Sequence, residues 1–183
     1  MSVTPGLAQL NPPIGEQDNV QGLPDAVVTL VEYGDFECGS CGLAYPIVKA
    51  IQAEFGDQLR FAFRHFPLTA VHPNAEKAAE AAEAAGAQGH FWQMHDMLFE
   101  HQSALEFTHL LMYAEAIGLD MTNFTQEMEA GIHMPRVRSD FNGGARCGVN
   151  ATPTFFINGI RHDLSWDEPV LRSAIMLAAE GQY

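Results

Sequence analysis

A pair of cysteines stands between a strand-like run and an amphipathic helix, and this placement constrains the fold more than any other feature of the sequence. Residues 27–33 (VVTLVEY) are nearly continuous in apolar character, which is typical of a strand buried on both faces of a sheet. Cys38 and Cys41 follow, and residues 43–55 then repeat apolar side chains every three or four positions. The cysteines therefore open a helix directly after a buried strand.

The rest of the chain predicts a second strand, a block of helices and a hairpin. Residues 59–65 (LRFAFRH) complete a βαβ unit, whose strands lie parallel and are joined by a right-handed crossover. No strand signal appears in residues 74–148, where the periodicity fits four or five helices, and the Ala- and Glu-rich stretch at 75–87 is most simply a solvated helix. Residues 154–163, with the turn pair Asn158-Gly159, predict a β-hairpin before a last helix.

The charge and hydropathy of the chain exclude several classes of partner. Its 183 residues carry 9 Lys and Arg against 23 Asp and Glu, and a net charge of −14 repels nucleic acids and anionic lipid headgroups. No apolar run approaches the roughly 18 residues that a membrane-spanning helix needs. We therefore expect a soluble protein without nucleic acid partners or membrane insertion.

The N-terminal segment and the cysteine count bear on order and location. Residues 1–25 are interrupted by prolines and lack apolar periodicity, which predicts an extended arm outside the core. The first basic residue is Lys49, so no secretory signal is expected. A lone C-x-x-C pair is typical of redox or metal chemistry in a reducing compartment. We therefore expect a cytoplasmic location, with a processed secreted fragment as the alternative.

Two thiols three positions apart at the start of a helix lie within one turn of each other. The free N–H groups and the positive end of the helix dipole favour a thiolate at Cys38, which makes it the predicted nucleophile. Cys41, one turn further, is the predicted buried thiol that resolves a mixed disulfide. Half of a zinc site is the alternative, but zinc needs four ligands, and only Cys147 and scattered histidines remain to complete one. We therefore favour redox chemistry and expect no metal.

The sequence Thr152-Pro153 stands directly before the apolar run of the predicted hairpin. A proline that enters a strand lacks an N–H and belongs at an edge or at a special turn. A cis bond at Pro153 would turn the backbone of Thr152 toward the cysteines, where its N–H and C=O could pair with an extended peptide. An ordinary trans proline at the start of an edge strand is the alternative.

Four segments together resemble the DsbA-like disulfide oxidoreductases of the thioredoxin superfamily. They are residues 27–41 (VVTLVEYGDFECGSC), 65–73 (HFPLTAVHP), 91–96 (FWQMHD) and 148–159 (GVNATPTFFING). The match covers nearly the whole chain and is most similar to the variant found alone in bacterial cytoplasm or fused to sodium/proton antiporters. The resemblance implies an α/β thioredoxin fold, βαβ then ββα around a mixed central sheet, with an inserted helical domain.

The resemblance also implies a domain organisation. Residues 26–65 and 151–183 would form the thioredoxin-fold domain, and residues 66–150 the inserted α-helical subdomain. Residues 1–25 would remain the N-terminal arm.

Roles for individual residues follow from the same resemblance. It implies that Pro153 is cis, that Cys38 is the attacking thiol and that Cys41 is the resolving thiol. Glu32 stands where relatives carry a buried acid, and a carboxylate beneath Cys41 could take its proton. A solvent-facing residue on an edge strand is the alternative for Glu32.

The neighbours of the motif complete the predicted site. The predicted substrate-binding residues are Phe36, Gly39, Ser40, Thr152 and Pro153, although an aromatic residue such as Phe36 is more often part of the core or of a groove wall. In many relatives proline follows the first cysteine, whereas Gly39 stands here.

The charge near the motif and the third cysteine lead to two further expectations. Asp35 and Glu37 precede Cys38 with no basic residue before Lys49, which predicts a weakly activated thiol and a potential near the reducing end of the family's range.

Cys147 is most simply a small buried residue at the end of a helix, with a third redox partner or a glutathionylation site as the alternative.

The predicted function is thiol-disulfide exchange with protein or peptide dithiols through the C-x-x-C pair, without a bound cofactor. Electrons would pass to or from a separate reductant or oxidant, such as glutathione or a thioredoxin-type system. One alternative is a noncatalytic thioredoxin-fold module that binds peptides or senses redox state. Another is a glutathione-dependent isomerase or transferase, which would not require Cys41.

Overall fold

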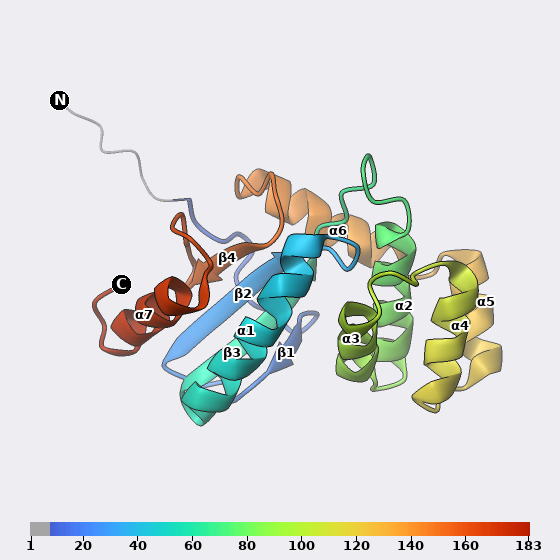
Figure 1. The fold of residues 1–183 in the computed structure, drawn as a ribbon, viewed down its shortest axis with the longest axis horizontal. Helices are drawn as coiled ribbons and strands as arrows, with labels where there is room; N and C mark the ends of the chain where they lie inside the picture. Colours follow the sequence, from blue (N-terminus) through green and yellow to red (C-terminus); the bar gives the residue numbers. More distant parts are fainter. Residues whose placement is uncertain (1–7) are drawn as a thin grey trace.

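The computed structural model describes residues 8–183 and shows a five-stranded sheet with helices around it (Figure 1). The strands are β1 Asn19–Gln21, β2 Val28–Gly34, β3 Leu59–His65, β4 Thr154–Ile157 and β5 Ile160–Arg161, in the spatial order β1-β3-β2-β4-β5. Strands β2 and β3 are parallel, and the other pairings of this sheet are antiparallel. The predicted mixed sheet with a βαβ unit is confirmed.

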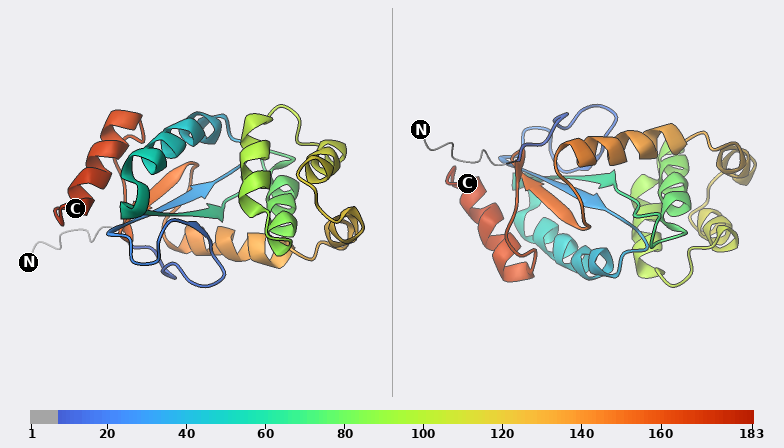
Figure 2. Two further views of the ribbon diagram at one scale, coloured as in Figure 1. Left: turned by 90° about the horizontal axis from the view of Figure 1, so that it is seen from below. Right: turned by 90° about the horizontal axis from the view of Figure 1, so that it is seen from above.

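Two helices cover one face of the sheet and a third covers the other. Helices α1 Gly39–Phe55 and α7 Glu168–Ala179 lie on the first face, and α6 Met134–Arg146 lies on the second (Figure 2). The alternation of side chains along β2 divides the core accordingly. Val28 and Leu30 share a cluster with residues of α1 and α7, whereas Val31 packs in a second cluster on the opposite face.

The remaining helices form the insertion between β3 and β4. They are α2 Ala75–Ala87, α3 Phe91–Glu100, α4 Phe107–Ala116 and α5 Met121–Ala130. With α6 they fulfil the prediction of four or five helices. The prediction that residues 75–87 form a solvated helix is wrong, because α2 buries eight residues and contacts four neighbouring helices. Alanine side chains are small enough to let these helices approach closely. None of the helices in residues 8–183 is long and apolar enough to cross a membrane.

The N-terminal segment departs from the predicted arm. Residues 1–7 lie outside the described residues. From residue 8 onward the chain follows the sheet: Leu10 N donates to Gly159 O at 2.8 Å, and β1 pairs with β3. Leu10, Ile14 and Val20 pack against the cluster on the α6 face. The prediction of an arm outside the core is wrong for this part, because its apolar residues are too irregularly spaced to show a period.

The hairpin between β4 and β5 has the predicted turn. Asn158 and Gly159 both adopt positive φ, 47° and 81°. A two-residue turn of this kind matches the twist of the flanking strands, and Asn followed by Gly is the pair that tolerates it best. Side-chain Oδ1 of Asn158 also accepts a hydrogen bond from Thr29 N at 2.8 Å, which joins the turn to β2.

Candidate active site

The two motif cysteines lie at the N-terminus of α1. Cys38 is the N-cap residue and Cys41 lies in the first turn. Cys38 is 8% exposed, whereas Cys41 is completely buried. Gly39 and Ser40 between them are exposed, and no atom would lie within 4 Å of a side chain added at Gly39. Cys38 therefore keeps a small exposed fraction beside two exposed residues, whereas Cys41 keeps none.

The loop before β4 meets this turn from the other half of the chain. The bond between Thr152 and Pro153 is cis, as the resemblance implied. The Sγ atom of Cys38 lies 3.4 Å from Thr152 O. Both loop residues are buried beside the motif. The structure therefore brings together residues that are 114 positions apart.

Hydrogen bonds strongly activate Cys38. The thiol of Cys41 donates to the Cys38 sulfur and is the largest contribution that lowers the pKa of Cys38, to about 5. Burial opposes ionisation. The contact with Thr152 and hydrogen bonds from the backbone at Cys41 and Ser40 lower the pKa further. At neutral pH the attacking group is a thiolate.

This low pKa contradicts the prediction that Cys38 is a weakly activated nucleophile. The prediction treated Asp35 and Glu37 as uncompensated negative charges. Instead, the buried Asp35 carboxylate accepts three hydrogen bonds, and the Glu37 carboxylate accepts two from Asn74. Most of these donors belong to residues 66–74, which the sequence pattern did not place beside the motif.

The pKa values of Cys41 and Glu32 are shifted in the opposite direction from that of Cys38. Burial raises the pKa of Cys41 well above its ordinary value, and the hydrogen bond to Cys38 and the charge of Glu32 raise it further. Glu32 is 2% exposed, and burial, together with the negative Cys38, raises its pKa to about 8. Its Oε1 has no hydrogen-bond partner among residues 8–183. A protonated acid therefore lies in the interior on the α1 face, near the buried thiol.

Phe36 lies in the core and offers no surface to a substrate. It is 1% exposed and stacks on Phe63 at 5.1 Å between ring centroids, with Phe99 at 4.9 Å on another side. The prediction of Phe36 as a substrate-binding residue is corrected accordingly. Its backbone precedes Cys38, but its ring points into the cluster between the sheet and α3.

Gln102 is a contributor that the sequence pattern did not reveal. Its Nε2 donates to Phe36 O at 2.8 Å and to Cys38 O at 2.9 Å, which ties the helical insertion to the turn before α1. A side chain added at Gly42 would collide with Gln102 Oε1, so the glycine makes room for the amide. The glycine next to Cys41 is the one local signal of this approach.

Cys147 lies apart from the motif cysteines. It is 5% exposed, in agreement with the predicted buried residue. Its Sγ accepts a hydrogen bond from Asn11 N at 3.1 Å and donates one to Asn11 O at 3.2 Å. Within residues 8–183 no three His, Cys, Asp or Glu side chains gather as a metal site.

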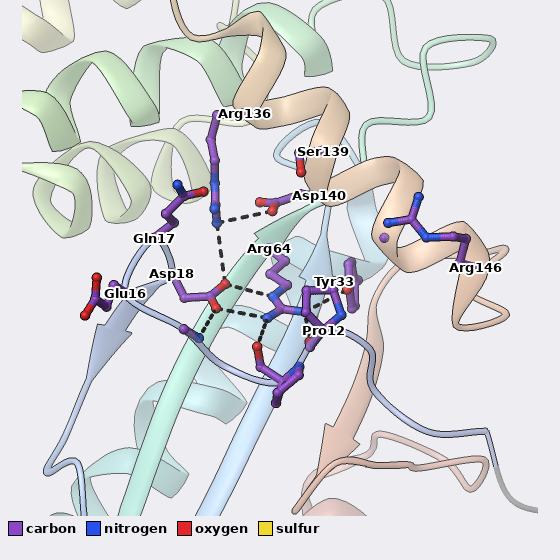
Figure 3. Close-up of a pocket in the computed structure, with 13 residues that line it drawn as sticks. Pro12, Glu16, Gln17, Asp18, Tyr33, Arg64, Arg136, Ser139, Asp140 and Arg146 are labelled. Atoms are coloured by element: carbon purple, nitrogen blue, oxygen red, sulfur yellow. Dashed lines mark hydrogen bonds and ion pairs between the residues drawn. The ribbon is translucent and has the colours of Figure 1, made fainter.

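A polar cavity of about 280 Å³ lies between the N-terminal segment, β3 and α6 (Figure 3). Here Arg64 donates to both carboxylate oxygens of Asp18, at 2.8 and 2.9 Å, and to the backbone carbonyls of Pro12 and Pro13. The Tyr33 hydroxyl accepts from the same guanidinium at 3.1 Å. These contacts fasten the N-terminal segment to the sheet, and none of them involves the motif.

A mixed sheet of this order, with a C-x-x-C helix facing a cis-proline loop and a helical insertion, defines a DsbA-like thioredoxin fold. The family model described as Thioredoxin matches residues 15–175, and the chain belongs to this family. The solved structure of oxidised BdbD from Bacillus subtilis superposes with a TM-score of 0.80 at 24% identity, covering 90% of this chain and 94% of that one. Wolbachia pipientis α-DsbA1 gives 0.80 at 21% identity, covering 93% and 94%.

The relatives of higher identity are longer proteins, and this chain matches only one part of each. A protein of Salinispora arenicola named Na(+)/H(+) antiporter NhaA 1 is 44% identical over 182 residues, which is 99% of this chain and 28% of that protein. A namesake from Mycobacterium sp. (strain KMS) is 44% identical over 93% of this chain. The chain thus spans less than a third of the length of these curated relatives.

Proposed function

We propose that this protein is a thiol-disulfide oxidoreductase that exchanges disulfides with protein or peptide dithiols. The observation that carries the proposal is the asymmetry of the two thiols. Cys38, which keeps 8% of its surface exposed, has a pKa of about 5, whereas Cys41 is completely buried and its pKa lies well above its ordinary value. An accessible thiolate in front of a protected thiol is the arrangement that thiol-disulfide exchange requires.

The exchange proceeds through one mixed disulfide. In the oxidising direction, a client thiolate attacks Cys38 in the Cys38–Cys41 disulfide, and Cys41 leaves as a thiolate. The second client thiolate attacks the client sulfur of the mixed disulfide and expels the Cys38 thiolate. The client loses two electrons and gains a disulfide, while the protein becomes a dithiol. A separate oxidant must then remove the two electrons, and the reverse sequence reduces a client.

Glu32 supplies the proton that the leaving thiolate needs. Its pKa of about 8 keeps it protonated at neutral pH, and the pKa of Cys41 lies above its ordinary value. The proton therefore moves from Glu32 to Cys41 as the disulfide opens and returns when it closes.

The low pKa of Cys38 favours the oxidising direction. A stabilised thiolate stabilises the reduced protein, so the disulfide form is the stronger oxidant. It also makes Cys38 a good leaving group from the mixed disulfide. We therefore place the potential toward the oxidising end, opposite to the sequence-based prediction.

Exposed backbone beside Cys38 supports a peptide-like client. Gly39 and Ser40 are exposed, and the Thr152 backbone lies next to the sulfur. An extended client strand can pair with such a loop while its cysteine reaches Cys38. The predicted cytoplasmic location stays a proposal. The similarity to antiporter-named proteins adds a membrane transporter with reactive thiols as a candidate partner.

The test is oxidation of a two-cysteine peptide by the disulfide form, with single-cysteine variants. Wild type should turn over with an added oxidant, and Cys38→Ser should be inactive. In the reverse direction, with the peptide supplied in its disulfide form, reduced Cys41→Ser should stop at a mixed disulfide between Cys38 and the peptide, detectable by mass, because no Cys41 thiol remains to release it. Undiminished turnover in Cys41→Ser would favour glutathione-type chemistry instead. A wild type that binds the peptide without oxidising it would favour a noncatalytic module.

A further inference from the structure

The loop between β3 and α2 is latched onto the turn that precedes Cys38. Leu68 N donates to the Asp35 carboxylate at 2.8 Å, and His72 Nδ1 lies 2.8 Å from the same oxygen. Two residues further, Asn74 donates to Glu37 from its backbone and its side chain, at 2.6 and 2.9 Å. Both acidic side chains of the turn are thus held by one loop.

The contact of His72 with Asp35 differs in kind from the others. The Asp35 side chain is fully buried, and its Oδ1 accepts from Glu37 N while Oδ2 accepts from Leu68 N and His72. A buried carboxylate is stable only when its charge and its lone pairs are compensated. Backbone amides satisfy lone pairs without adding a net charge. Among these partners only the His72 ring can carry a compensating positive charge.

That charge matters because Asp35 is adjacent to the reacting sulfur. Cys38 N donates to Asp35 O at 3.1 Å, so the carboxylate belongs to the same turn as the thiol. An uncompensated negative charge there would oppose formation of the thiolate. Burial by itself lowers the pKa of His72, but Asp35, Cys38 and Glu37, the acidic groups around the ring, raise it above its ordinary value. The positive charge of the His72 ring and the negative charge of the Cys38 thiolate therefore stabilise each other.

We propose that His72 is a positioning residue that sets the reactivity of Cys38 by neutralising Asp35 from outside the C-x-x-C motif. The inference rests on the proposed function and deepens it. His72 contacts Asp35 and acts on the sulfur through that carboxylate and through its own charge. Because the helical insertion supplies the loop that carries His72, the insertion helps to set the redox potential of the cysteine pair as well as packing against it.

The experiment measures alkylation of Cys38 by iodoacetamide between pH 4 and pH 9 in the reduced full-length protein. In His72→Asn the amide replaces Nδ1 as a donor to Asp35 but carries no charge. We expect the midpoint of the profile to rise, with the rate at pH 5 falling about fivefold, the loss of thiolate that a rise of about one pKa unit produces. Rates at the alkaline end should coincide.

Two companion variants separate charge from structure. His72→Lys restores a positive charge and should move the midpoint back toward the wild-type value. His109→Asn makes the same change at a partly exposed histidine of α4, which is paired with Glu106, and should leave the midpoint unchanged. An unchanged midpoint in His72→Asn, or an equal shift in His109→Asn, overturns the proposal. Alkylation needs no client, so an inactive wild type with a low midpoint would count against the proposed function alone.

Discussion

Replacing Glu32 by Gln should make the reduced protein progressively more stable than wild type as the pH rises. The pKa of Glu32 is about 8 in the folded protein, whereas the unfolded chain releases this proton at the ordinary pKa of 4.5. Between these values the unfolded state binds fewer protons, so the free energy of unfolding of wild type falls as pH increases. Glutamine has no such proton and removes this loss.

The size of this stability difference follows from the pH interval over which it is measured. Each pH unit costs at most about 1.4 kcal/mol, and because part of the unfolded chain is still protonated at pH 5, the advantage of Glu32→Gln should grow by about 2.5 kcal/mol between pH 5 and pH 7. Glu32 is completely buried, so solvent screening does not reduce this figure. Any constant cost of burying the amide cancels, because it is the same at both pH values.

Urea unfolding of both proteins at pH 5 and pH 7, in a reducing buffer, measures this difference. Glu129→Gln, at an exposed position, is the matched control and should give a difference that does not change with pH. Parallel pH profiles for wild type and Glu32→Gln would refute the reasoning, because they would mean that Glu32 is ionised in the folded protein.

Three further predictions concern contacts around the site and the sheet. Gln102→Ala should lower the free energy of unfolding by about 1–2 kcal/mol in urea titrations, because two backbone carbonyls lose their donor; no loss would mean that water replaces the amide. Gly42→Ala should lower the free energy of unfolding in the same assay, because the added methyl group collides with the Gln102 amide. The double variant with Gln102→Ala should lose less stability than the sum of the two single losses, since the colliding amide is gone. Strictly additive losses would contradict a contact between the two residues. Asp18→Asn should cost about 3–5 kcal/mol, because the 4% exposed Arg64 side chain loses its carboxylate partner; a wild-type melting temperature would show that the pair is dispensable.

The parts of the fold that the sequence predicted are those whose signals are local. Strand β3 has the predicted ends, and β2 is displaced by one residue. The turn Asn158-Gly159 dictates the hairpin because only its two residues must accept positive φ. The cysteine pair is likewise readable, since its spacing and the helix that follows place both thiols on one turn. Buried Cys147 agrees with the common behaviour of that residue type.

The errors concern residues whose role depends on distant partners. The charges of Asp35 and Glu37 predicted a weak nucleophile, and only the fold shows that residues 66–74 compensate them. Phe36 is adjacent to the motif in sequence, but α3 and β3 close over its ring. The Ala- and Glu-rich composition of α2 does not reveal that other helices surround it. In each case the missing information is which segment packs against the residue.

The measurement that tests the account most directly is the ionisation of Cys38 in the reduced wild-type protein. The rate of iodoacetamide alkylation at this residue, identified by fragment masses, should follow a single titration with a midpoint near pH 5. A midpoint in the range of an ordinary thiol, about 8.5, would show that the contacts from Cys41 and Thr152 do not hold a thiolate, and would remove the basis for the proposed exchange chemistry.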